Sequence, residues 1–244
     1  MKFRLLSYNV HQCVGTDGHR SVERVAEVIR HHAPDVVCLQ EVVWHETDPS
    51  DHAQPRRLAD LLGMPHGAVG LYRNLKGGAW GNVTLSRFPI AESETLDLSL
   101  LVRGKRTRGT LYTHLHVDRR TLHLFNLHFG LAGFERSAQI ARVLDRADEV
   151  APHGAPVVLV GDTNDWRNKL CSGELAKAGF TAATCDPRNS GPATFPSRSP
   201  VAALDKLFLR GHVRAKRHFV SRLADATLAS DHLPVLIEME LTSS

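Results

Sequence analysis

Long apolar runs, paired cysteines and a strong excess of one charge are missing from this sequence of 244 residues. No apolar stretch approaches the roughly 20 residues of a membrane-spanning helix, and the segment MKFRLLSYNV lacks the apolar core of a signal peptide. The four cysteines form no C-x-x-C pair, and Cys38 lies inside an apolar run where a buried reduced thiol is expected. These absences favour a soluble, cytoplasmic protein with reduced cysteines and no integral membrane segment.

The charge balance is only mildly basic, with 30 Lys and Arg residues against 26 Asp and Glu and a formal net charge of +4. This balance suits an anionic substrate, but it is too weak to indicate nucleic-acid binding by itself. The length is ample for a sizeable core, and neither a linker nor a break in composition divides the chain. We therefore expect one domain over residues 1–244, acting as a monomer.

Two strand–helix–strand units stand out from the hydrophobic pattern. The first has a strand over 3–10, a helix over 20–32 that Pro34 ends, and a strand over 35–40. The second has strands over 121–127 and 156–161 around a helix over 134–150. Because such a crossover makes its two strands parallel, the strands of each unit end at the same sheet edge. Two copies of the unit predict two sheets packed face to face with helices outside.

The remaining segments predict further strands. Between the units we expect an antiparallel meander, which places the loops 71–80 and 102–107 at the same edge as the strand ends. Its strands are 81–86, 90–101, 108–117 and 121–127. After the second unit we expect a helix near 169–178, a Pro/Gly/Ser-rich loop over 187–200, a hairpin of strands 204–210 and 213–220 that turns at Gly211-His212, and a last strand after Pro234.

Polar residues gather where these strands end. Asp162 and Asn164 follow a buried strand two residues apart, so their side chains share one face and can together position and deprotonate a nucleophile. Strand direction brings six more polar residues to this edge: Asn9, Glu41, His128, Asp205, Asp231 and His232. Carboxylate and amide oxygens suit Mg²⁺ or Mn²⁺. Glu41 is the first candidate for a ligand, with Asn9 and Asp231 in support.

Each of these residues also has an ordinary structural interpretation. Asn9 could cap a strand end, Asp205 could be a turn carboxylate, and His128 could pack in the core. Ser230-Asp231-His232 could form a turn, which Ser and Asp favour. The convergence of six separate segments on one edge favours the functional interpretation of all of them together.

The same residues occur in motifs that resemble those of the endonuclease/exonuclease/phosphatase family. These are, in family order, YNV with Asn9, LQE with Glu41, NLH with His128, GDTN with Asp162 and Asn164, LDKLF with Asp205, and SDH with Asp231 and His232. The stretch GNVTLSRFPI (81–90) is similar to small bacterial members, and the family's usual GDFN reads GDTN here. The resemblance implies a DNase I-like, four-layer αββα sandwich and Mg²⁺-dependent cleavage of a phosphoester.

The resemblance also implies a role for each residue. Asp162 orients or deprotonates the attacking water, and Asn164 holds that water or a phosphate oxygen. His232, fixed in one tautomer by Asp205, contacts the scissile phosphate, while His128 donates to a phosphate oxygen or to the leaving group. Three further residues are assigned to substrate binding, namely Arg108, Asn82 and Asn126.

Three functions are consistent with these motifs. Compact loops and modest charge favour hydrolysis of a phosphodiester in a small molecule or lipid head group. A DNA or RNA nuclease is the alternative, and it predicts steep salt dependence because it needs several phosphate contacts. A non-catalytic binding module is disfavoured because every motif residue is intact. Trp44, Trp80 and Trp166 fall on predicted edge segments, where they could stack on a base or pack the rim.

Overall fold

Two mixed sheets of six strands pack face to face in the computed structural model, which describes residues 1–45, 54–100, 107–185 and 191–242. The first sheet has the order β11 (Val213–Val220), β12 (Val235–Leu241), β1 (Lys2–Asn9), β2 (Val36–His45), β4 (Gly78–Ser86), β3 (His66–Leu75). The second has the order β5 (Ile90–Asp97), β6 (Gly109–Val117), β7 (Arg120–His128), β8 (Val157–Asp162), β10 (Asp205–Arg210), β9 (Thr181–Ala182).

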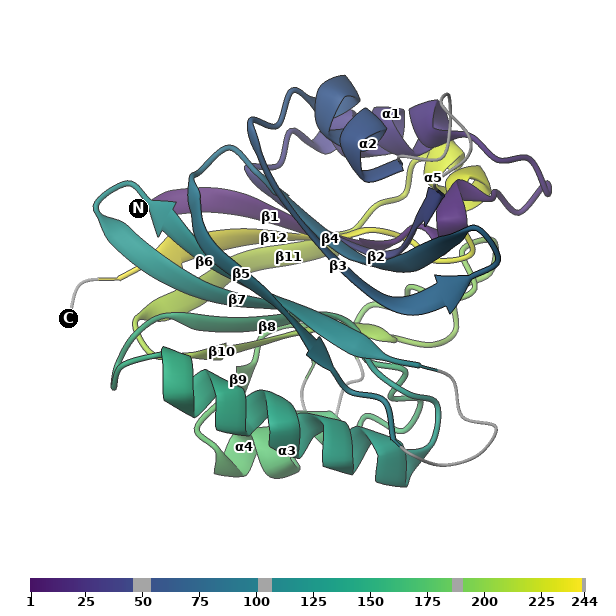
Figure 1. Cartoon of the computed structure of the whole chain (residues 1–244). Coiled ribbons are helices and arrows are strands. Elements are labelled where there is room, and N and C mark those ends of the chain that lie inside the picture. The colour runs from purple at the N-terminus through teal and green to yellow at the C-terminus, as the bar shows by residue number, and fades with distance from the viewer. Residues whose placement is uncertain (46–53, 101–106, 186–190, 243–244) are drawn as a thin grey trace.

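Helices cover the outer face of each sheet (Figure 1). The first sheet carries α1 (Val22–His32), α2 (Gln54–Leu62) and α5 (Ala224–Ala229), and the second carries α3 (Gly133–Val150) and α4 (Glu174–Lys177). Short 3-10 helices, η1 (His11–Cys13) and η2 (Lys169–Cys171), follow β1 and precede α4. This arrangement confirms the predicted four-layer αββα sandwich.

Both strand–helix–strand units have parallel strands, as predicted. β1 pairs with β2 so that Asn9 lies opposite Gln40, and β7 pairs with β8 so that His128 lies opposite Asp162. The apolar core fills the space between the sheets and beneath α1, with Leu5, Leu124 and Ile29 all fully buried. The parallel pairs therefore deliver the ends of four strands to one edge of the sandwich.

Two predicted strand pairings are wrong. β4 pairs with β2 and β3 in the first sheet, whereas β5 begins the second sheet, so the chain changes sheets at Arg87-Phe88-Pro89. β10 and β11 likewise form no hairpin, because β10 pairs with β8 and β9 while β11 pairs with β12. A short turn looks the same in sequence whether it folds a strand back on its neighbour or passes it to the facing sheet.

The hydrophobic pattern also missed α2 and β3. The segment 71–80, predicted as an edge loop, is the hairpin between β3 and β4, which does lie at the predicted edge. The other predicted edge loop, 102–107, falls almost entirely outside the described residues, as do positions 187–190 of the Pro/Gly/Ser-rich loop. In the described parts of the chain, no helix is both long and apolar enough to cross a membrane.

The expectation that all cysteines are reduced is wrong for two of the four. Cys171 and Cys185 form a disulfide that joins η2 to the segment after β9, whereas Cys13 and Cys38 are buried thiols outside any disulfide. Nothing in their spacing of 14 residues marks them as a pair, because only the fold brings η2 beside this segment.

Removal of this disulfide should lower the free energy of unfolding without displacing the polar residues at the strand ends. Closing a loop of this length stabilises the folded state by about 3 kcal/mol through the entropy of the unfolded chain. We expect the Cys171→Ala/Cys185→Ala variant to unfold roughly 6–12 °C below the wild type in a thermal scan. A reductant should shift the wild type toward the variant and leave the variant unchanged; equal melting temperatures would contradict the prediction.

A second effect on stability arises on the outer face of β6 and β7. The rings of His114 and His123 stack 4.7 Å apart, and the Tyr112 hydroxyl lies 2.9 Å from His123 Nδ1. Burial, and then the neighbouring His114, lower the pKa of His123 from 6.5 to about 4. The folded state therefore favours the neutral ring, so its contribution to stability is complete above pH 6.5 and falls as the pH drops toward 4.

Urea unfolding at several pH values tests this effect of His123. Between pH 6.5 and 4 the wild type should lose up to about 3 kcal/mol more unfolding free energy than His123→Gln, which has no titrating ring. Parallel pH curves for the two proteins would show that His123 does not carry the effect.

Candidate active site

The predicted polar residues meet at the end of the sandwich away from the N and C labels (Figure 1). β1, β2, β7 and β8 run toward this edge, while β10 and β12 start there. The centre of the cluster is Asp162, the last residue of β8, whose side chain is buried. Gly161 before it has φ +141° and lies so close to the Leu127 backbone that any Cβ would clash, so this position requires glycine.

Two N–H donors, the Asn9 side-chain amide and the Asn164 backbone, organise two carboxylates at this point. Asp162 accepts hydrogen bonds from Asn9 Nδ2 at 3.1 Å and from the backbone N–H of Asn164 at 3.0 Å. Asn9 Nδ2 also lies 3.5 Å from Glu41 Oε1, so one amide spans both carboxylates. Asn164, held at φ 48° with its own amide donating to the Phe129 carbonyl, completes the predicted pair with Asp162.

Glu41 reaches the cluster through an irregularity in β2. The strand runs on to His45 instead of ending at residue 40, but its register with β4 shifts between Leu39 and Val42. Glu41 has φ 58° at this bulge, a backbone conformation that side chains other than glycine rarely adopt. Such a bulge re-aims one side chain, and here it turns the Glu41 carboxylate toward Asn9 and His128.

His232 is held by a carboxylate on the opposite side of its ring. Its Nδ1 lies 2.9 Å from Asp205 Oδ2, which also accepts a hydrogen bond from Thr194 Oγ1 at 2.6 Å. Its Nε2 points to Asp162 Oδ2 at 3.8 Å. Burial lowers the pKa of His232, but the opposing effect of Asp205, supported by Asp162 and Asp231, is stronger and raises that pKa to about 10. The surrounding carboxylates therefore favour the charged form of the ring.

His128 approaches the same carboxylates from β7. Its Nε2 lies 3.7 Å from Glu41 Oε1 and 3.8 Å from Asp162 Oδ2, and its Nδ1 lies 3.0 Å from the Tyr72 hydroxyl. The Trp80 ring packs against it at 5.4 Å between centroids. Both histidines thus direct Nε2 at Asp162, so two imidazoles and two carboxylates meet at this point.

The carboxylates of the cluster fit a hard divalent cation, whereas the Asn9 amide does not face it with its oxygen. Glu41 and Asp162 bring two carboxylates together, and burial raises the pKa of Asp162 to about 6 despite the nearby His232. Crowded oxygen donors of this kind suit Mg²⁺ or Mn²⁺. Asn9, predicted as a ligand, instead turns its Oδ1 to the His11 N–H at 3.0 Å and its Nδ2 to the carboxylates. Among the described residues, no group of three or more His, Cys, Asp and Glu side chains is arranged as a complete metal site.

Asp231 and Arg108 flank the cluster on two sides. Asp231 is partly exposed, 4.0 Å from His11 Nδ1, and its neighbour Ser230 donates to the Asn9 carbonyl at 2.7 Å. Arg108 precedes the residue opposite His128 and is only 4% exposed, yet its Nε and Nη1 have no hydrogen-bond partner among the described residues. A buried guanidinium left in this state is costly, which points to an anionic ligand.

Asn82 and Asn126 do not line the cleft, contrary to the prediction. Both are fully buried between the sheets. Asn126 donates to the carbonyls of Leu39 and Val83 and accepts from Gln40, so it ties the two sheets together. Residues 126 and 128 share a face of β7, but only His128 lies at the end of the strand, where the site is. Asn126 lies two residues earlier and is covered by the facing sheet.

Sequence reasoning missed two residues that hold the histidines. Thr194 supports Asp205 from a loop without a recognisable pattern, and Tyr72 contacts His128 from the unpredicted strand β3. Of the three tryptophans, Trp80 is buried beside His128 while Trp166 is 53% exposed and contacts Phe195, whose ring lies 4.9 Å from His232. Trp44 is also exposed, at 36%, so Trp166 is distinguished by its link through Phe195 to His232.

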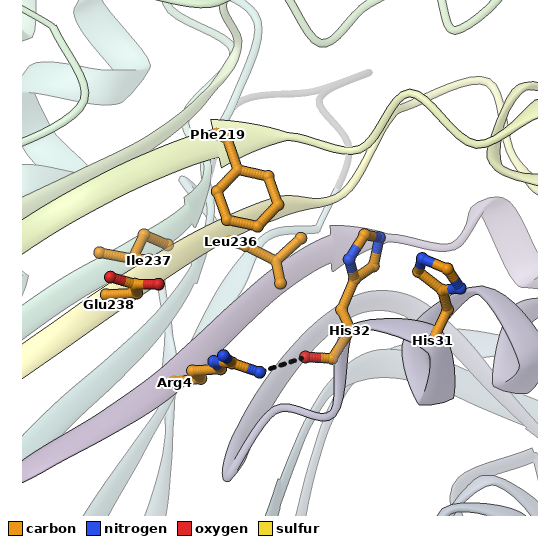
Figure 2. Close-up of a pocket in the computed structure, with 7 residues that line it drawn as sticks. All are labelled: Arg4, His31, His32, Phe219, Leu236, Ile237 and Glu238. Carbon is orange, nitrogen blue, oxygen red and sulfur yellow. Dashed lines mark hydrogen bonds between the residues drawn. The ribbon is translucent and has the colours of Figure 1, made fainter.

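A small pocket elsewhere takes no part in this cluster. It has a volume of about 150 Å³ and is formed by α1, β1, β11 and β12, with His31, His32 and Phe219 around its mouth (Figure 2). Arg4 in its wall donates to the His32 carbonyl at 3.5 Å and precedes Asn9 by five residues, or roughly 16 Å of strand.

Two mixed six-stranded sheets flanked by helices are the architecture of the DNase I-like proteins, a class of hydrolases that act on phosphoester bonds. The chain belongs to the endonuclease/exonuclease/phosphatase family, whose sequence model matches residues 6–232. The uncharacterized protein YbhP of Escherichia coli is 30% identical over 251 residues, which cover 98% of this chain and 96% of YbhP.

Solved structures of the family show the same fold. An endonuclease/exonuclease/phosphatase from Beutenbergia cavernae superposes with a TM-score of 0.83 at 26% identity, covering 99% of this chain and 72% of that one. TDP2 from D. rerio, solved with a single-strand DNA product, gives a TM-score of 0.71 at 20% identity over 98% and 99% of the two chains. At that identity the likeness to TDP2 concerns the fold alone.

Proposed function

We propose that this protein is a divalent-metal-dependent phosphodiesterase that uses in-line attack by an activated water. The observation that supports this most is the meeting of His128 Nε2 and His232 Nε2 on one carboxylate oxygen of Asp162, beside Glu41. Four groups that can accept, donate and stabilise charge around one small space are what a phosphoryl transfer requires.

Each residue of the cluster then has its own role in the reaction. Asp162, oriented by Asn9 and Asn164, positions the water and accepts its proton. Asp205 at 2.9 Å from Nδ1 favours the imidazolium form of His232, which donates a hydrogen bond from Nε2 to a non-bridging phosphate oxygen. His128 serves the leaving oxygen from the other side, and Arg108 pairs with the phosphate through its free N–H groups. Glu41 and Asp231 would hold a Mg²⁺ or Mn²⁺ ion, which supplies positive charge to the phosphoryl group.

A phosphodiester in a small molecule or lipid head group is the substrate class we favour, because the net charge of +4 is modest. A nuclease is the second candidate, and the support for it is that TDP2 from D. rerio, which shares the fold, was solved with a single-strand DNA product. The exposed Trp166 beside Phe195 could stack on a base in that case.

One set of assays separates these substrates. Bis-p-nitrophenyl phosphate and a nicked-plasmid assay are run with Mg²⁺ or Mn²⁺ at low and high salt. Turnover of the small diester without nicking supports the favoured class, and nicking that falls steeply with salt supports the nuclease. Inactivity on both, and on monoester and lipid panels, would contradict a hydrolase and leave a phosphate-binding module.

The disulfide bears on where the protein works. Disulfides persist in oxidising compartments and are uncommon in the cytosol, so the Cys171–Cys185 pair favours an oxidising compartment over the predicted cytoplasm. Acid quenching of cells followed by alkylation and mass spectrometry should find these two cysteines protected and Cys38 alkylated after unfolding.

A further inference from the structure

A chain of hydrogen bonds leads from the buried sheet interface to the outer nitrogen of His128. The Asn126 carbonyl accepts from Asn82 Nδ2 at 2.7 Å, and Asn82 Oδ1 lies 2.9 Å from the Tyr72 hydroxyl. The same hydroxyl lies 3.0 Å from His128 Nδ1. Asn82 and Asn126 are fully buried, so water does not compete for these groups.

The direction of each hydrogen bond follows from the first. A backbone carbonyl can only accept, so Asn82 must turn its NH₂ to Asn126 and its oxygen to Tyr72. That oxygen also can only accept, so the single proton of the Tyr72 hydroxyl goes to Asn82. Burial raises the pKa of Tyr72 well above its usual 10, which keeps this proton in place. The remaining contact, between the Tyr72 oxygen and His128 Nδ1, then needs a proton on the histidine.

We propose that Tyr72 and Asn82 are positioning residues that fix His128 with its proton on Nδ1, so that His128 exchanges protons with bound groups only through Nε2. Nε2 is the nitrogen that faces Glu41 and Asp162. In a neutral His128 it is then an acceptor, and it can donate to the leaving oxygen only after it has first taken up a proton. The catalytic meaning of this tautomer rests on the proposed function, but the tautomer itself does not.

The two active-site histidines are therefore fixed by different partners. His232 Nδ1 faces the Asp205 carboxylate, a charged acceptor, whereas His128 Nδ1 faces a neutral phenol. A carboxylate stabilises an imidazolium and a neutral phenol does so far less. The two rings thus differ in the group that holds Nδ1, which is a carboxylate for His232 and a phenol hydroxyl for His128.

The direct test is the tautomer of His128 in metal-free protein labelled with ¹⁵N-histidine. Long-range ¹H–¹⁵N spectra distinguish the two ring nitrogens, and the signals of His128 are those missing from His128→Gln. At a pH where the ring is neutral, we expect the proton on Nδ1. A proton on Nε2 in the wild type would overturn the proposal without any variant, and without reference to activity.

Two variants test the hydrogen-bond relay that runs from Asn82 through Tyr72 to His128. Asn82→Leu removes the acceptor of the Tyr72 proton, which should then turn to His128 Nδ1 and move the histidine proton to Nε2. Tyr72→Phe removes the hydroxyl that faces Nδ1 and should lower the share of the Nδ1–H tautomer, with kcat on the small diester lowered roughly 10–100-fold and KM little changed. An unchanged Nδ1–H in folded Tyr72→Phe, or unchanged kcat, would overturn the relay even if the buried Asn82→Leu fails to fold.

The chain offers a matched control on the far face of the second sheet. The Tyr112 hydroxyl lies 2.9 Å from His123 Nδ1, outside the active site. Tyr112→Phe should alter the signals of His123, leave those of His128 unchanged and preserve kcat. If the wild type hydrolyses no phosphoester but shows His128 protonated on Nδ1, the proposed function fails while the positioning relay stands.

Discussion

Replacing Glu41 with glutamine should lower metal-dependent phosphodiester hydrolysis by roughly 10³-fold while the folded state keeps its stability. The carboxylate sits on a bulge, 20% exposed, and its described partners are Asn9 and His128. Loss of its charge removes the group best placed to hold a divalent ion. Calorimetric titration with Mn²⁺ should show weaker binding in parallel with the loss of turnover.

The melting temperature of Glu41→Gln and a control substitution at Glu94 separate loss of the metal site from loss of the fold. A change at a partly exposed side chain usually alters the unfolding free energy by less than about 0.5 kcal/mol, so the melting temperature should move by no more than about 2 °C. Glu94→Gln is the matched control, because Glu94 lies on the outer strand β5 and pairs with Arg146. Wild-type turnover in Glu41→Gln at limiting Mn²⁺ would refute the assignment of the metal site.

Loss of the His232 ring should reduce kcat by roughly 10²–10⁴-fold, the range expected for a positioned acid or base. The substitution His232→Gln removes the imidazolium that faces Asp162 and the phosphate, so the effect should fall on kcat rather than on KM. A rise in KM with kcat unchanged would instead make His232 a residue that only binds substrate. Steady-state kinetics on bis-p-nitrophenyl phosphate distinguishes the two.

His232→Gln must be compared with a double variant that also changes Asp205, because the Asp205 carboxylate is buried. Without His232, the Asp205 carboxylate keeps only Thr194 among its described side-chain partners, and an uncompensated buried charge can cost about 3–5 kcal/mol. His232→Gln/Asp205→Asn should regain much of this stability while remaining as slow as the single variant. If the double variant recovers activity together with stability, the loss in His232→Gln came from unfolding and not from chemistry.

The sequence predicts the site better than it predicts the sheets. Asn9, Glu41, His128 and Asp162 could be brought to one edge because a strand–helix–strand crossover fixes the direction of both strands. No comparable rule tells a strand which sheet it joins. The turns at Arg87-Phe88-Pro89 and Gly211-His212 therefore read as hairpins, although each carries the chain from one sheet to the other.

The finer features of the site depend on tertiary contacts that leave no periodic signal. The bulge at Glu41 interrupts a strand whose residues are apolar on both sides of it, so the hydrophobic pattern predicts an end where the strand continues. Tyr72 reaches His128 only because Gly109 leaves space for its ring beside β6. The disulfide likewise depends on η2 and the segment after β9 meeting in the folded chain.

The central claim is that one cleft holds both the cation-binding carboxylates and the phosphate-binding imidazole. Anomalous diffraction from crystals soaked with Mn²⁺ and inorganic phosphate tests this directly. We expect a manganese peak at the Glu41 carboxylate and a phosphate that bridges from it to His232 Nε2. A manganese peak remote from Glu41, or a phosphate bound away from His232 while Mn²⁺ occupies Glu41, would contradict the account.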